Sequence, residues 1–268
     1  MKESILNIVC EIKFVIIPSI SSGFCFNLCA DLKYIKMKDL ILNNGIIDYK
    51  FLKHADLVFD VGLNLGEKAA SFLDLGCRVV GFEPQRNIYL QAVNRFKNNG
   101  NFIGENVALD DSKGVSTIRI ASFHTISSMN LEYIRNVKKL RFSTYSWDSE
   151  EVVNTDTLDN MISKYGVPKY IKIDVEGHEL NVLRGLTSRI EYISIEFITE
   201  MLGPVKECLD YVDRLNEKKS SFNYIYGNND NFYFEHWIGK DEIIAYLDSV
   251  NDRQNEFGDI FIRNKEKG

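Results

Sequence analysis

The chain has few cysteines, no excess of positive charge, no internal repeat and no low-complexity segment. Its 268 residues include 5 cysteines, and its formal net charge at pH 7 is −6. The cysteines are odd in number and scattered, and Cys25 and Cys29 lack the second ligand pair that a zinc site needs. We therefore expect free thiols in a reducing cytoplasm. Negative charge without a basic stripe predicts that nucleic acid is not a partner.

The N-terminal apolar run, residues 5–17, is too short and too charged to span a membrane. Glu11 and Lys13 interrupt it and Pro18 ends it, whereas a spanning helix needs about 20 mostly apolar residues. The basic start and small-residue cleavage site of a signal peptide are not convincing either. We expect no transmembrane segment and an amphipathic helix that packs on the core or on a second subunit. Contact with a membrane surface is the alternative.

Length and composition are ordinary for a folded globular protein. Hydrophobic residues make up 45% of the chain and charged residues 26%. The length suits one large α/β domain preceded by an extension. We predict a mostly helical extension over residues 1–54, which covers the open end of a ligand site or forms a homo-oligomer contact. The main domain is predicted over residues 55–268.

Residues 57–84 have the pattern of a strand, a glycine turn, a helix and a second strand. An apolar run of β-forming residues leads into a G-x-N-x-G turn at residues 62–66, and a helical pattern follows until Gly76. A second apolar run, residues 79–82, leads to Glu83. This pattern predicts the first unit of a doubly wound, Rossmann-like α/β fold, in which ligands lie outside the carboxyl ends of the strands.

The glycine turn and the acid each suit the binding of a nucleoside. Gly62 and Gly66 carry no Cβ, so the backbone can approach a ligand closely. The amides that open the following helix favour a negative group such as a carboxylate. Glu83 lies about 20 residues after the turn, where a carboxylate accepts hydrogen bonds from ribose hydroxyls. The alternative is an ordinary strand-to-helix turn with a surface glutamate.

A third strand is predicted over residues 102–109. In a doubly wound fold its end lies beside Glu83, where the adenine of a nucleoside would lie. The backbone at Ala108 and the side chain of Asp110 or Asp111 are therefore candidates to contact the adenine. For the two aspartates, a turn made of Asp-Asp-Ser-Lys-Gly is an equally good interpretation.

Residues 122–148 are polar and aromatic without a clear period. A long irregular stretch in a compact domain is often a lid or a binding loop. The candidates for contact with an acceptor molecule, each with a plain surface position as its alternative, are His124, Ser127, Ser128, Tyr133, Tyr145 and Trp147.

Two consecutive predicted strands, separated by one helix, each end in a carboxylate. The run from Tyr170 ends at Asp174, and the next ends at Glu196. Parallel strands place both acids on the edge that carries the glycine turn, where converging carboxylates suit proton transfer or cation binding. His178 opens the intervening helix and can reach the same pocket, with a structural role as its alternative. For the acids, the alternative is charge compensation at a helix N-terminus.

The remaining patterns complete an α/β fold with a mostly parallel sheet and one antiparallel late strand. Asp156 is expected to cap one of the helices. The predicted helices cover residues 87–97, 158–165, 209–215 and 242–247, and the predicted strands cover residues 115–120, 221–226 and 259–263.

The segments now in hand resemble the FkbM-type S-adenosylmethionine-dependent methyltransferases, from about residue 55 to residue 263. They are DVGLNLGEK, FEP, TLDNMISKYGVPKYIKIDVEGHE, VLRGL, SIEF, SFNY and GDIFIR, in that order. The resemblance implies a Rossmann-like fold, S-adenosylmethionine as cofactor, and methyl transfer to a hydroxyl of a sugar, glycan or natural product. Leu63 and Ala69 depart from the usual small residue and threonine; the first would tighten the pocket and the second removes a hydroxyl.

The resemblance also implies roles for individual residues. The methionine end of the cofactor would be held by Asp60, Gly62, Asn64 and Gly66, and the ribose by Glu83. The segment from Asp174 to Glu179 and Glu196 would border the acceptor, a small molecule or a glycan. The main domain would then be the methyltransferase catalytic domain.

For methyl transfer to a hydroxyl, we expect Asp174 to act as base or metal ligand, His178 to assist and Glu196 to orient. A divalent cation held by Asp174 and Glu196 is left open, and no residue is assigned to a metal. Two other classes stay as alternatives: an oxidoreductase with a nucleotide cofactor, although the turn lacks the middle glycine of the dinucleotide motif, and a non-catalytic nucleoside-binding module.

Overall fold

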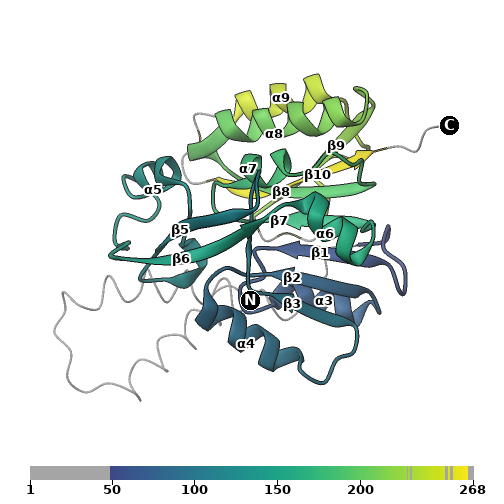
Figure 1. The fold of residues 1–268 in the computed structure, drawn as a ribbon. Helices are drawn as coiled ribbons and strands as arrows, with labels where there is room; N and C mark the ends of the chain where they lie inside the picture. Colours follow the sequence, from purple (N-terminus) through teal and green to yellow (C-terminus); the bar gives the residue numbers. More distant parts are fainter. Residues whose placement is uncertain (1–48, 228, 230, 251–252, 254–255, 265–268) are drawn as a thin grey trace, which may run out of the picture. The chain divides into compact units, whose positions relative to one another are not determined.

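The computed structural model describes residues 49–227, 229, 231–250, 253 and 256–264 (Figure 1). The predicted N-terminal amphipathic helix and homo-oligomer contact lie outside the described residues. The described part opens with Tyr49 and Leu52, which are buried in a hydrophobic core together with Phe72 and Tyr170. The boundary between residues 54 and 55 stays a prediction.

The main sheet has seven strands in the order β3-β2-β1-β7-β8-β10-β9. All neighbours from β3 to β8 are parallel, and β10 is antiparallel to both β8 and β9. The predicted fold class, a doubly wound and mostly parallel sheet with an antiparallel late strand, is confirmed. The strands are β1 (Leu57–Val61), β2 (Arg78–Phe82), β3 (Phe102–Glu105), β7 (Tyr170–Ile173), β8 (Tyr192–Ile198), β9 (Ser220–Tyr226) and β10 (Phe257–Asn264).

Helices cover both faces of this sheet (Figure 1). Alternate residues of β1 enter two different hydrophobic cores, Phe59 on one face and Val58 on the other, because successive side chains of a strand point to opposite faces. The helices on the face of Phe59 are α6 (Leu158–Tyr165), α7 (Glu179–Arg184), α8 (Leu202–Leu215) and α9 (Lys240–Ser249), and those on the face of Val58 are α3 (Glu67–Asp74) and α4 (Arg86–Phe96).

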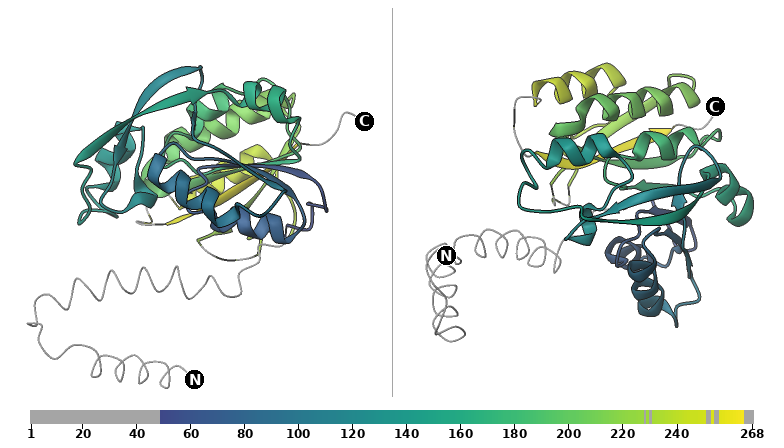
Figure 2. Two further views of the ribbon diagram at one scale, coloured as in Figure 1. Left: turned by 60° about the horizontal axis from the view of Figure 1, so that its bottom comes forward. Right: turned by 60° about the vertical axis from the view of Figure 1, so that its left-hand side comes forward.

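A second, three-stranded sheet lies beside the carboxyl ends of the parallel strands (Figure 2). Its order is β4-β6-β5, with β6 parallel to β4 and antiparallel to β5. A short 3₁₀ turn (His124–Ile126) and α5 (Leu131–Val137) follow β5. The strands are β4 (Ala108–Leu109), β5 (Gly114–Ile120) and β6 (Ser149–Asp156).

Three sequence expectations need correction here. The predicted strand over residues 102–109 is two strands, since β3 ends at Glu105 and β4 belongs to the second sheet. The irregular stretch contains α5, and β6 was not predicted. Thr157, rather than Asp156, caps α6: its hydroxyl accepts a hydrogen bond from the Asn160 amide at 3.2 Å, while Asp156 ends β6.

Two further findings concern general properties. Cys77 and Cys208 are free and buried, as expected, and the other cysteines lie outside the described residues. Of the helices in the described part, none combines the length and the apolar character that crossing a membrane requires.

Candidate functional site

The turn after β1 adopts a backbone that favours glycine. The φ angles of Gly62, Asn64 and Gly66 are 84°, 51° and 80°, in the left-handed region where a Cβ is disfavoured. A Cβ at Gly62 would lie 1.8 Å from the carbonyl oxygen of Asp174, and one at Gly66 would lie 2.4 Å from the ring of Phe96. Both glycines are therefore required by the packing of the protein itself, and the close approach at Gly62 lies where the ends of β1 and β7 meet.

Glu83 lies directly beside this turn. Its Oε2 accepts a hydrogen bond from the Asn64 amide at 3.0 Å, and its Oε1 accepts one from the Gln85 amide at 2.9 Å. The Gln85 side chain also donates to the carbonyl of His124 at 3.3 Å. Glu83 is 4% exposed, and burial raises its pKa to about 7, although the hydrogen bonds favour the ionised form. The glycine turn and Glu83 are thus adjacent at the same edge of the sheet.

Asp60, near the end of β1, is almost completely buried. Within the described part of the chain, neither of its carboxylate oxygens accepts a hydrogen bond. The Nζ of Lys172, its register partner in β7, lies 3.7 Å from its Oδ1. Burial raises the pKa of Asp60 to about 6, and the charge of Lys172 opposes this shift. A buried carboxylate with unused acceptor capacity suits a cationic group of a ligand.

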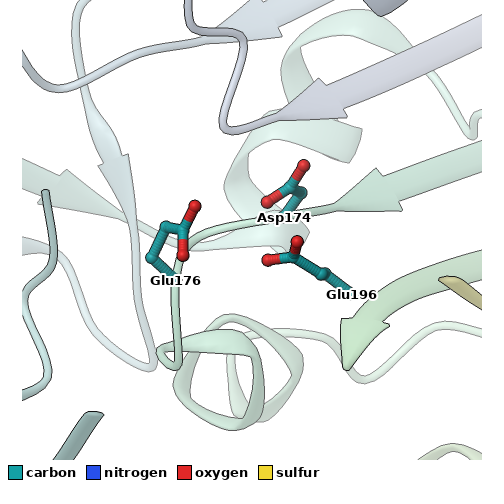
Figure 3. Close-up of side chains that lie close together, drawn as sticks. All are labelled: Asp174, Glu176 and Glu196. Atoms are coloured by element: carbon teal, nitrogen blue, oxygen red, sulfur yellow. The ribbon is translucent and has the colours of Figure 1, made fainter. Parts of the chain in front are cut away.

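Three carboxylates converge where β7 ends and β8 approaches its end. Asp174 follows β7, Glu176 lies two residues further along the chain, and Glu196 is in β8; one oxygen from each lies within 4.8 Å of the others (Figure 3). Burial, together with the charges of Asp174 and Glu176, raises the pKa of Glu196 well above its ordinary value. The sequence analysis brought Asp174 and Glu196 together correctly in space, but gave Glu176 no role of its own.

Lys172 is the cation that lies beside Asp174 and Asp60. Its Nζ donates to Oδ2 of Asp174 at 2.9 Å, and its side chain is 5% exposed. Burial lowers the pKa of Lys172, but the charges of Asp174 and Asp60 outweigh it and raise the value. Lys172 was not predicted from the sequence as part of the site. The available signal was a lysine inside an apolar strand, two residues before Asp174 and therefore on the same face.

Asp110 and His178 lie against each other. Nε2 of His178 is 3.1 Å from Oδ1 of Asp110, and Asn181 of α7 donates to the same oxygen at 3.3 Å. Burial would raise the pKa of Asp110, but its interaction with His178 and the hydrogen bond from the Asp111 amide outweigh it and lower the pKa. The imidazole of His178 lies close to Asp110, but its Nε2 forms no hydrogen bond within the described residues. Contact of Asp110 or the buried Ala108 with an adenine stays a prediction.

We call residues 121–148 the cap segment. Three of the residues predicted to contact an acceptor have side chains that bond or pack within this segment, and their contact with an acceptor stays a prediction. These are Ser127, Tyr145 and Trp147. Two others, Ser128 and Tyr133, are 1% exposed and reach the turn after β7.

The two departures from the family pattern lie in the hydrophobic core. Leu63 is 2% exposed, and its side chain packs on Gly81, where a Cβ would lie 2.6 Å from it. Ala69 is completely buried in the same core. Leu63 therefore fills space between the turn and β2, and its effect on the ligand site stays a prediction.

Known proteins are similar to this chain in sequence and in fold. Hexuronic acid methyltransferase AglP of Haloferax volcanii is 26% identical over 174 residues, which cover 62% of this chain and 64% of that protein, so the match spans less than two thirds of its length. Among solved structures, precorrin-6y C5,15-methyltransferase of Geobacter metallireducens gives a TM-score of 0.42 at 8% identity, with 85% of this chain and 88% of that chain covered. Fibrillarin of Aeropyrum pernix, solved with S-adenosyl-L-methionine bound, gives 0.39 at 9% identity, with 78% and 67% covered.

The family itself is settled by a match of a different kind. The family model described as Methyltransferase FkbM domain matches residues 60–226, a range that starts at Asp60, includes Glu83 and all three converging carboxylates, and ends with β9. Because this match spans more than half of the chain, the protein belongs to the FkbM methyltransferase family.

Proposed function

We propose that this protein uses S-adenosylmethionine to methylate a hydroxyl of a sugar or glycan, with residues 55–268 as the catalytic domain. The observation that carries the proposal is the hydrogen bond from the Asn64 amide to Glu83. It joins the glycine turn to the candidate ribose acid, at the same sheet edge as the three carboxylates. A cofactor and an acceptor could therefore meet at that edge.

The residues of the first unit fit the cofactor. Each carboxylate oxygen has two acceptor sites, so Glu83 can accept ribose hydroxyls in addition to its backbone donors. The buried oxygens of Asp60 lack hydrogen bonds within the described residues, and they suit the ammonium of the methionine end. The backbone from Gly62 to Gly66 suits its carboxylate. Ala108 and Asp110 are proposed beside the adenine.

The acids suit the acceptor. S-adenosylmethionine supplies a methyl group on a sulfonium, which needs an in-line nucleophile at close range. Asp174, whose carboxylate accepts a hydrogen bond from the ammonium of Lys172, would take the proton of the acceptor hydroxyl. The hydroxyl oxygen would bond to the methyl carbon as the bond from that carbon to the sulfonium sulfur breaks, which leaves S-adenosylhomocysteine. Glu196, an oxygen of which lies within 4.8 Å of an oxygen of Asp174, orients the acceptor through a hydrogen bond. His178, which lies beside Asp110, assists from the start of α7.

The class of acceptor rests on the named relative, which methylates a hexuronic acid according to its description. A sugar hydroxyl is a weak nucleophile and fits a site that offers a nearby base. The three carboxylates also offer oxygen ligands to a hard divalent cation. Carboxylates alone do not select a metal, so no step is derived through one.

The test has two parts. Calorimetry should detect binding of S-adenosylhomocysteine, with no signal from NAD or NADP, which an oxidoreductase would bind. Transfer of a radiolabelled methyl group from S-adenosylmethionine should then be measured over UDP-glucose, UDP-glucuronic acid, p-nitrophenyl glycosides and small phenols. Binding without transfer to any of them would favour a non-catalytic module, and transfer to phenols alone would contradict the sugar acceptor.

A further inference from the structure

The cap segment is fastened to the turn after β7 by three side chains. The Ser128 hydroxyl donates to the carbonyl of Glu176 at 2.6 Å, and the Asn130 side-chain amide donates to the carbonyl of Gly177 at 2.5 Å. The Tyr133 hydroxyl donates to the carboxylate of Glu176. These residues lie more than 40 positions before the turn in the chain, so the contacts are tertiary and specific to the folded domain.

The turn that they hold has an unusual backbone. The φ angles of Glu176 and Gly177 are 56° and 89°, and a glutamate rarely adopts the left-handed region without support from its surroundings. The ring of Tyr133 packs directly on this turn, because a Cβ at Gly177 would lie 2.6 Å from the Cβ of Tyr133. Together, the ring contact and the three hydrogen bonds fix both the backbone and the side chain of Glu176.

Tyr133 is suited to the role of a permanent donor. It is 1% exposed, and burial, followed by the charge of Glu176, raises its pKa well above the ordinary value. The phenol therefore stays protonated and keeps donating to Glu176. Within the acid group, that hydrogen bond restricts the carboxylate of Glu176 to the position beside Asp174 and Glu196 (Figure 3).

We propose that Tyr133 is a positioning residue of the acceptor site, and that the Glu176 carboxylate it holds orients the acceptor hydroxyl. Glu176 approaches Asp174 and Glu196 from the side of the cap segment, so it can accept a hydrogen bond from a second hydroxyl of a sugar while Asp174 takes the proton of the reacting one. This inference rests on the proposed methyl transfer, and it extends the site to a residue of the cap segment.

The test is the Tyr133→Phe variant, which keeps the ring on Gly177 and removes only the hydroxyl. With the best acceptor from the panel above, kcat/KM for the acceptor should fall about tenfold, the effect expected for one lost hydrogen bond to a charged group. The Kd for S-adenosylhomocysteine should stay within about twofold. Tyr211→Phe is the matched control, since it removes a hydroxyl that donates to the Leu186 carbonyl at 3.0 Å, and it should leave both values unchanged.

A double-mutant cycle separates positioning from a general effect on folding. In a Glu176→Gln background, Tyr133→Phe should cause little further loss, because the charged partner is already gone. An equal loss in both backgrounds, or unchanged acceptor kinetics in Tyr133→Phe, would overturn this inference while leaving the proposed function intact. Absence of methyl transfer by the wild-type protein would overturn the proposed function, and this inference with it.

Discussion

The two halves of the candidate site are built in different ways. In the half proposed to bind the cofactor, from β1 to β3 and called the cofactor half, the backbone sets the positions: the left-handed turn at residues 62–66, and the amides of Asn64 and Gln85 that donate to Glu83. In the acceptor half, from β7 to β8, they are set by side-chain charges, with three acids, one lysine and contacts from the cap segment.

This difference has a physical consequence. A backbone site is fixed by a short run of sequence, so one pattern can serve many proteins with the same cofactor. A site made of side chains can be altered one residue at a time without disturbing the turn. The two halves should therefore respond separately to substitution, and the predictions below test that separation.

The largest effect is expected in the acceptor half. Asp174→Asn keeps the shape but removes the proton acceptor, and kcat should fall about a thousandfold, within the range for general base catalysis. The Kd for S-adenosylhomocysteine, measured by calorimetry, should change less than about threefold. Normal turnover in this variant would remove Asp174 from the mechanism, and a large loss of cofactor affinity would mean that the halves are not separate.

Lys172 links the two halves, because its ammonium lies near Asp174 of the acceptor half and near Asp60 of the cofactor half. Lys172→Met leaves two carboxylates without their cation, which should lower the free energy of unfolding by about 3 kcal/mol. Lys169→Met is the control, because Lys169 pairs with Glu191 where both side chains are about 30% exposed, and it should cost less than about 1 kcal/mol. Urea unfolding measures both; equal losses would contradict the central role of Lys172.

In the cofactor half, Glu83→Gln should weaken binding of S-adenosylmethionine about thirtyfold, or about 2 kcal/mol, as a charged acceptor becomes neutral. At saturating cofactor, kcat should stay within about twofold of the wild type. Calorimetry and steady-state kinetics on the same preparation check this pair of values. A fall in kcat with an unchanged Kd would contradict the assignment of Glu83 to the ribose.

Much of the fold could be predicted from the sequence where the signal is local. The strands β1, β2, β7, β8 and β10 carry mostly buried apolar runs, and the helices α3 and α4 carry an apolar period on one side. These elements were located within a few residues. β6 was missed because its first half is mostly exposed and polar. Its partner strand β5 also lies about 35 residues earlier in the chain. β6 forms a strand because it pairs with β5, and its own sequence does not indicate a strand.

The acceptor half shows the same limit at the level of the site. The positions of Asp174 and Glu196 followed from the strand order, because parallel strands end at one edge. The contacts of Glu176 could not be predicted from the sequence, because nothing near residues 128–133 indicates that this segment folds back onto the turn after β7. The sequence did carry one local signal for α5, an asparagine at position 130, a residue type that often caps helices. In the structure, Asn130 accepts hydrogen bonds from the Glu132 and Tyr133 amides.

The smallest predicted effect is a pH dependence that belongs to the cofactor half alone. The pKa of Glu83 is raised to about 7 by burial, so in the free protein its proton stabilises the fold at low pH, and that contribution is lost as pH rises through 7. Ribose hydroxyls donate to the ionised form, so binding of S-adenosylhomocysteine should weaken about tenfold from pH 8 to pH 6, with proton release on binding near pH 7. Calorimetry in buffers of different ionisation enthalpy measures both quantities. Glu83→Gln should flatten this dependence while Asp174→Asn preserves it; the reverse pattern would mean that cofactor binding depends on the charges of the acceptor half, and the contrast between the two halves would fail.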